Sequence, residues 1–153
     1  MKSVAIIGAG LSGLVVAQRL QASADVTLFE KSRGVGGRMA TRYADEIEFD
    51  HGAQFFTARS RAFKSFLQPL IDAGVVAQWN ADFAELDRNE VKSTRSWDDE
   101  YPHYVGAPRM NAIGKHLAAD LNVVNQTAVT NIERRADGWT LVDDSGAESG
   151  PFD

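Results

Sequence analysis

The chain contains no cysteine among its 153 residues. This absence excludes disulfides, thiolate metal sites and a cysteine-linked flavin within the sequence. No apolar run approaches the ~20 residues that a membrane-spanning helix needs, and a membrane partner is not expected. Basic residues are in the minority, with 16 Lys and Arg against 21 Asp and Glu, for a formal net charge of −5. Because binding a nucleic-acid backbone needs a basic face, nucleic acid is not expected as a partner either.

The overall composition is typical of a globular protein. With 44% hydrophobic residues the chain can bury a sizeable core, and its length predicts one domain plus part of another. Met1 and Lys2 lead directly into an apolar segment and leave no room for a secretory signal peptide, so the expected location is cytoplasmic. The three histidines lack metal-ligand spacing, and no metal site is expected. The oligomeric state is left open.

The most informative pattern is a glycine-rich turn between an apolar segment and a helical one. Residues 4–7 (VAII) are wholly apolar, as is typical of a parallel strand buried on both faces. Residues 8–13 (GAGLSG) follow at once, and apolar residues then recur at helical spacing. We expect Gly8 to allow the turn, Gly10 to admit a pyrophosphate to the backbone, and Gly13 to let the helix pack closely on the strands.

An acidic residue follows at the distance that ribose binding requires. Residues 26–29 (VTLF) are expected to form a second strand that ends at Glu30, about 20 residues after Gly10. The carboxylate would bind ribose hydroxyls and repel a 2′-phosphate. The helix starting at Leu11 would direct its free amides and positive dipole end at the phosphates, with the Ser12 hydroxyl as a further donor. A packed turn beside a solvated acid is the competing interpretation, and the order of strand, turn, helix and acid disfavours it.

A second glycine-rich segment distinguishes one dinucleotide from another. Residues 33–38 (RGVGGR) follow the acid, where a simple nicotinamide-binding unit needs no glycine. Lys31, Arg33 and Arg38 flank these glycines, and guanidinium groups bind phosphate oxygens bidentately. We predict that this loop carries its cations back to the phosphates; a mobile basic surface loop is the alternative.

Together these motifs resemble the FAD-binding half of the flavin-containing amine oxidase superfamily. Three further segments are similar to its renalase-like branch: residues 50–57 (DHGAQFFT), 104–111 (YVGAPRMN) and 137–141 (DGWTL). The resemblance covers essentially the whole chain. His51 departs from it, because the branch has an apolar residue there.

The resemblance implies FAD as the cofactor and a small molecule as the substrate. It implies hydride transfer from dihydronicotinamide isomers to FAD and then to oxygen, giving hydrogen peroxide. Amine oxidation and a nucleotide-binding fragment without turnover are the alternatives. No catalytic residue is assigned. The expected cofactor-binding residues are Gly8, Gly10, Leu11, Ser12, Gly13, Glu30, Lys31, Gly37, Arg38, Met39, Ala53, Gln54, Phe55, Phe56 and Val129.

The fold expected is α/β, a Rossmann-like FAD-binding domain with a parallel sheet and a βαβ unit. Residues 1–57 and 104–153 would form this domain, incompletely, and residues 58–103 would be part of an inserted α+β substrate domain. Relatives of this type run about twice as long, so we expect a truncated chain. Other expected elements are a half-exposed strand within 43–50, helices over 60–73 and 111–121, strands over 75–79 and 123–129, a hairpin or loop over 80–103, and a hairpin joining 132–135 to 139–142.

Several aromatic and apolar side chains have more specific expectations. Phe63 and Phe66 share a helical stripe and are expected only to pack in the core. Phe55 and Phe56 are adjacent, so they should point to opposite sides. The strand that includes Val129 is expected beside the strand of Glu30, with the Val129 backbone at the adenine edge, as the resemblance implies.

Overall fold

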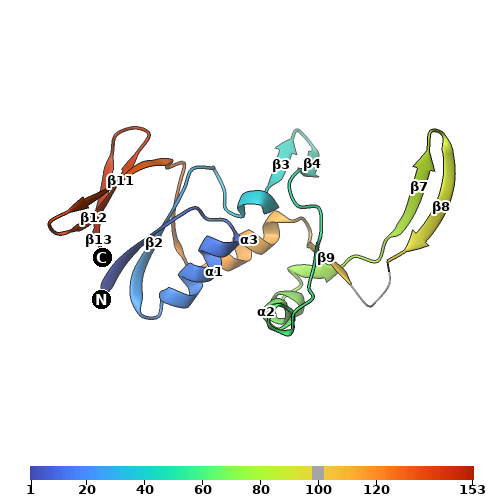
Figure 1. Cartoon of the computed structure of the whole chain (residues 1–153), viewed down its shortest axis with the longest axis horizontal. Helices are drawn as coiled ribbons and strands as arrows, with labels where there is room; N and C mark the ends of the chain where they lie inside the picture. Colours follow the sequence, from blue (N-terminus) through green and yellow to red (C-terminus); the bar gives the residue numbers. More distant parts are fainter. Residues whose placement is uncertain (98–101) are drawn as a thin grey trace.

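The computed structural model describes residues 1–97 and 102–153, so part of the predicted hairpin or loop over 80–103 lies outside the described residues. In chain order the elements are β1 (Lys2–Ile7), α1 (Leu11–Leu20), β2 (Ala24–Glu30), the 3₁₀ turn η1 (Gly37–Met39), β3 (Thr41–Ala44), β4 (Ile47–Asp50), β5 (Phe56–Thr57), α2 (Arg61–Asp72), β6 (Val76–Gln78), β7 (Asp82–Asp87), β8 (Glu90–Ser96), β9 (His103–Gly106), α3 (Asn111–Ala118), β10 (Asn122–Asn125), β11 (Val129–Arg135), β12 (Gly138–Asp143) and β13 (Glu148–Phe152) (Figure 1).

A parallel sheet in the order β1-β2-β10 confirms the predicted α/β class. Helix α1 connects β1 to β2, which completes a βαβ unit, and α3 lies beside α1 (Figure 1). Leu14 and Leu28 are fully buried, and Leu117 of α3 packs in the same core. The expectation that the first strand is buried on both faces is wrong. In the described chain β1 is an edge strand, and half of the Ile7 side chain is exposed.

The predicted continuous strand over 123–129 is also wrong. Strand β10 ends at Asn125, which pairs with Glu30, and the chain then turns at Gln126, whose φ is 56°. This positive φ breaks the extended run, and the next strand, β11, joins a separate antiparallel sheet with β12 and β13. Val129 therefore pairs with Asp143 and does not lie in the sheet of Glu30.

The remaining elements follow the sequence expectations more closely. Helix α2 begins after Ser60, whose hydroxyl accepts a 3.2 Å hydrogen bond from the Phe63 N–H, and it ends before Gly74 at φ 70°. Strands β7 and β8 form a hairpin, and so do β3 with β4 and β11 with β12. Strand β9 pairs with both β5 and β6, so the two ends of segment 58–103 lie together. No helix in the described part of the chain is long and apolar enough to cross a membrane.

Candidate functional site: a dinucleotide cleft

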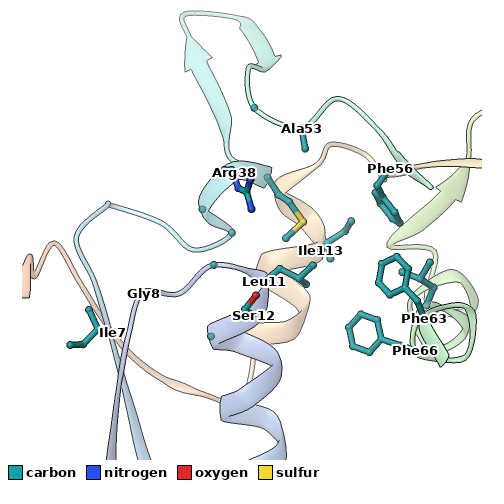
Figure 2. A pocket seen from close by; sticks show the side chains of 17 residues that line it. Ile7, Gly8, Leu11, Ser12, Arg38, Ala53, Phe56, Phe63, Phe66 and Ile113 are labelled. Carbon is teal, nitrogen blue, oxygen red and sulfur yellow. The ribbon is translucent and has the colours of Figure 1, made fainter. Parts of the chain in front are cut away.

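A cavity of about 850 Å³ opens where the start of α1, η1, α2 and α3 converge (Figure 2). Its wall contains ten of the residues expected from the sequence: Gly8, Gly10, Leu11, Ser12, Gly13, Gly37, Arg38, Met39, Ala53 and Phe56. Seven further residues complete it: Ile7, Gly36, Gly52, Phe63, Phe66, Leu67 and Ile113.

One end of the cavity is suited to an anion. Gly10 is the N-cap of α1, makes no side-chain capping bond, and leads into a first turn without an acidic residue. The amides of such a turn lack intrahelical partners and favour negative charge. A Cβ built on Gly10 would meet no protein atom within 4 Å, so the space beside this backbone is open to a ligand. Arg38 on η1 contributes the only charged side chain lining the cavity among the described residues (Figure 2).

Gly13 allows close packing of the helix, whereas Gly10 leaves open space for a ligand. A Cβ at Gly13 would collide with the Gly8 carbonyl oxygen and would also lie 3.4 Å from Ile6. The glycine therefore lets α1 approach the turn and β1 closely, as the sequence predicts for this position.

Glu30 holds the glycine turn in place. Its buried carboxylate accepts a 2.8 Å hydrogen bond from the Ala9 N–H and a 2.9 Å bond from the Ser32 N–H. Burial would raise the pKa of Glu30, but hydrogen bonds from Ser32 and Ala9 and the charge of Lys31 together bring it below its ordinary value. Glu30 is therefore ionised at neutral pH, with lone pairs remaining on both oxygens for a ligand.

The second glycine segment lies between the turn and α3. The Gly36 N–H donates a 2.8 Å hydrogen bond to the Ala9 carbonyl, and a Cβ on Gly37 would lie 3.2 Å from Gly10 Cα. On the other side, a Cβ on Gly114 of α3 would lie 2.8 Å from Gly36 Cα. The sequence analysis missed Gly114, although an isolated glycine inside a helical pattern often marks close packing.

The other end of the cavity is apolar. Phe56, Phe63 and Phe66 lie around it, with Leu67 and Ile113 (Figure 2). Phe63 and Phe66 were expected only in the core, and this expectation is wrong. Both are half-buried, so each packs on the core with one side and lines the cavity with the other.

The five remaining expected residues are not among those lining the cavity. Phe55 points away from Phe56, as predicted, and its ring lies 5.1 Å from Trp97 and 5.0 Å from His103. The others are Glu30, Lys31, Gln54 and Val129, and the contact of all five with a cofactor stays a prediction. Arg33 also turns away from this cavity and lines a second cleft, so within its loop only Arg38 follows the expected direction.

The parallel sheet and its βαβ unit give the domain a Rossmann-like fold. Residues 6–70 match the family described as "NAD(P)-binding Rossmann-like domain". This match covers the glycine turn, the acid, the second glycine segment and most of α2.

Two curated relatives are desaturases by name. The chain is 48% identical over 50 residues to "4,4'-diapophytoene desaturase (4,4'-diaponeurosporene-forming)" of Staphylococcus haemolyticus (strain JCSC1435). It is 46% identical over 50 residues to the protein of the same name from Staphylococcus aureus (strain Newman). Each match covers 32% of this chain and 10% of the desaturase.

Solved structures with a similar fold span nearly the whole chain. Tetracycline destructase Tet(51) matches with a TM-score of 0.68 at 14% identity, covering 97% of this chain and 36% of that protein. The 2,6-dihydroxypyridine-3-hydroxylase of Arthrobacter nicotinovorans matches with a TM-score of 0.57 at 12% identity, covering 97% of this chain and 34% of the hydroxylase. At these identities the likeness shows the fold, and the chain spans about a third of either protein.

Proposed function

We propose that the cavity binds FAD and that the chain is the FAD-binding part of a renalase-like flavin oxidoreductase. One observation carries the proposal. A single cavity has a helix N-terminus and Arg38 at one end and three phenylalanines at the other. A dinucleotide with a large apolar ring system needs this combination of an anion site and an apolar wall.

The residues present fit this cofactor. The open space beside Gly10 would admit a pyrophosphate, and Arg38 would add a charge-assisted bond to it. Ala53 is fixed at the cavity wall, because its N–H donates a 2.7 Å hydrogen bond to the Arg38 carbonyl. Phe56, Phe63 and their neighbours would exclude water from a flat ring.

A nicotinamide dinucleotide is the competing ligand, and it is the one that the family description names. The second glycine segment and the phenylalanine wall support FAD instead, because a nicotinamide ring is smaller and more polar than a flavin. Glu30 disfavours a 2′-phosphate in either case.

The lining residues also bear on the reaction. Bound FAD would supply a hydride acceptor, and the protein would orient the donor against it and exclude water. Among the described residues no acid or base lines the apolar end, where Phe56, Phe63 and Ile113 lie. This supports direct hydride transfer from a planar reduced donor over proton abstraction from an amine. We therefore propose dihydronicotinamide isomers as substrates, oxygen as the acceptor and hydrogen peroxide as the product.

Two other functions remain as competing proposals. An amine oxidase of the wider superfamily would use the same cofactor cavity. A nucleotide-binding fragment would bind FAD without turnover. In each case residues 1–57 and 104–153 would hold most of the cofactor. Segment 58–103 would lie toward the substrate and would add Phe63, Phe66 and Leu67 to the cofactor wall.

Anaerobic mixing of the FAD-reconstituted protein with candidate donors distinguishes the three. The 2- and 6-dihydronicotinamide dinucleotides should bleach the flavin absorption rapidly, and air should restore it with release of peroxide. Benzylamine should leave the spectrum unchanged over the same time. Bleaching by the amine alone would establish the amine oxidase, and no bleaching by any donor would establish binding without turnover.

A further inference from the structure

A second cleft, of about 750 Å³, lies on the far side of the glycine loop from the cofactor cavity. The contact between Gly114 and Gly36 separates the two: Ile113 of α3 lines the first, whereas Asn111 and Lys115 line the second. Its wall includes Arg33, Arg42, Tyr43, His51, Asn111 and Lys115.

The charge of this cleft is opposite to that of the chain. Arg33, Arg42 and Lys115 line it, with His51, and no acidic residue does, although the chain has a net charge of −5. In the described part of the chain none of these three cations forms an ion pair, and Arg33 and Arg42 have no hydrogen-bond partner. Their charges are therefore available to a ligand.

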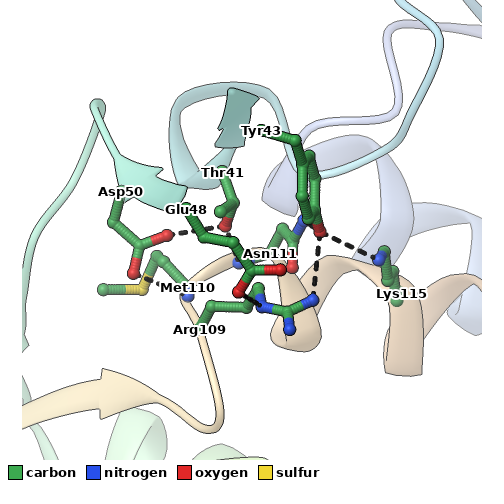
Figure 3. A network of polar contacts seen from close by, with 8 residues as sticks. All are labelled: Thr41, Tyr43, Glu48, Asp50, Arg109, Met110, Asn111 and Lys115. Atoms are coloured by element: carbon green, nitrogen blue, oxygen red, sulfur yellow. Dashed lines mark hydrogen bonds and ion pairs between the residues drawn. The ribbon is translucent and has the colours of Figure 1, made fainter. Parts of the chain in front are cut away.

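The nearby acids are already engaged elsewhere (Figure 3). Glu48 pairs with Arg109 at 2.6 Å. Asp50 accepts a 2.6 Å hydrogen bond from the Thr41 hydroxyl and a 3.0 Å bond from the Met110 N–H. These contacts hold β3 and β4 against the start of α3 and leave the cations of the cleft uncompensated.

Tyr43 lies on the same wall and accepts hydrogen bonds from three neighbouring donors (Figure 3). Its oxygen accepts hydrogen bonds from Asn111 at 2.9 Å, Arg109 at 3.3 Å and Lys115 at 3.4 Å. These bonds, that of Asn111 first, hold the pKa of the Tyr43 hydroxyl below its ordinary value against the effect of desolvation. Tyr43 thereby orients Asn111, Arg109 and Lys115 at the edge of the cleft.

We propose that this cleft binds the diphosphate of a nucleotide, as a site separate from the cofactor cavity. Two guanidinium forks and an ammonium group match the several negative charges of a diphosphate better than one carboxylate. The volume of the cleft exceeds the need of an inorganic anion and leaves space for a nucleoside. The proposal does not depend on the identity of the cofactor.

Isothermal titration with inorganic pyrophosphate at saturating FAD tests the anion site directly, because FAD then occupies the anion end of the cofactor cavity. The wild-type chain should bind pyrophosphate, and Arg42→Gln should weaken binding roughly tenfold, the usual effect of one lost charge-assisted bond. Arg42→Gln with Lys115→Gln should abolish it, whereas Lys64→Gln, on the exposed side of α2, should change nothing. Because Arg42 has no protein partner in the described chain, thermal melting of Arg42→Gln should match the wild type.

A second set of titrations separates this cleft from the cofactor cavity. In the FAD-saturated protein Arg38→Gln should leave pyrophosphate affinity unchanged. In the apoprotein FAD should displace only the pyrophosphate that binds beside Gly10 and Arg38, and not the pyrophosphate of the second cleft. ADP should bind more tightly than pyrophosphate to the FAD-saturated protein, with the same loss in Arg42→Gln. Loss of pyrophosphate binding in Arg38→Gln but not in Arg42→Gln would place the anion in the cofactor cavity and overturn the inference. The inference would also be overturned if the wild type did not bind pyrophosphate, or if it bound pyrophosphate but not ADP.

Discussion

The backbone N–H of Gly36 donates a 2.8 Å hydrogen bond to the carbonyl oxygen of Ala9. The N–H of the same Ala9 donates to the Glu30 carboxylate at 2.8 Å, so both polar groups of this residue are fixed from outside its own turn. The geometry of the glycine turn therefore depends on the acid and on the second glycine segment. Changes at those sites should therefore alter cofactor binding through the shape of the turn, beside any contact they make with the cofactor.

Gly114→Ala should test how closely α3 packs against the second glycine segment. The new Cβ would lie 2.8 Å from Gly36 Cα and 3.1 Å from Gly36 N, both backbone atoms. Overpacking of about 1–3 kcal/mol should outweigh the ~1 kcal/mol that alanine gains in a helix, so the free energy of unfolding in urea should fall. Gly34→Ala is the matched control: its Cβ meets nothing within 4 Å, and its stability should stay within about 0.5 kcal/mol of wild type. Equal effects of the two substitutions would contradict the account.

Substitution by alanine should lower mainly FAD affinity at Gly10 and mainly stability at Gly13. Gly10→Ala places its Cβ in open space, so the protein should fold with a loss below about 1 kcal/mol from the weaker N-cap. Its FAD affinity should nevertheless fall at least roughly tenfold, because the methyl group occupies the path of the pyrophosphate. Gly13→Ala should lower the melting temperature, since its Cβ meets the Gly8 carbonyl. Thermal melts with FAD fluorescence titrations measure both effects, and normal FAD binding by Gly10→Ala would refute the assignment.

Glu30 should make stability depend on pH in one direction. Its pKa in the folded chain lies below the ordinary value of 4.5, so its contribution is complete above that pH and is lost as pH falls through the lower folded pKa. The free energy of unfolding of the wild type should therefore decline more on acidification below pH 4.5 than that of Glu30→Gln. Parallel pH profiles for the two proteins would show that the carboxylate charge contributes nothing to the turn.

Arg38→Ala should weaken FAD binding by about 1.5–3 kcal/mol, the usual worth of a hydrogen bond to a charged group. The stability of the apoprotein should change little, because the Arg38 side chain points into the cavity (Figure 2). Arg61→Ala removes an exposed arginine from the start of α2 and should leave FAD affinity unchanged. An equal loss of FAD affinity in both variants would show that Arg38 acts only through the net positive charge of the protein and not through a direct bond to FAD.

The glycine turn could be predicted from sequence because its signals are local. A strand, a turn and a helix follow one another directly there, and α1 begins at Leu11 as predicted. The apolar end could not be predicted in this way. Phe63 and Phe66 repeat at helical spacing whether the stripe faces a core or a cavity, and only the packing of α2 decides between them.

Contacts between segments distant in the chain account for the other differences between the sequence-based predictions and the structure. Residues 123–124 and 128–129 are both apolar, and the positive φ of Gln126 that sends them to different sheets has no clear signal in a glutamine. Arg33 and Arg38 look equivalent in the sequence, yet one lines each cleft. The contact of Gly114 with Gly36 separates those clefts, and it joins segments distant in the chain.

The identity of the dinucleotide is the central claim, and a titration of the purified apoprotein with FAD and with NAD⁺ tests it most directly. FAD fluorescence should be quenched in a saturable way, and excess NAD⁺ should not reverse the quenching. Arg38→Ala should shift the FAD curve to higher concentration, while Arg61→Ala should not. Saturable binding of NAD⁺ without any binding of FAD would contradict the account.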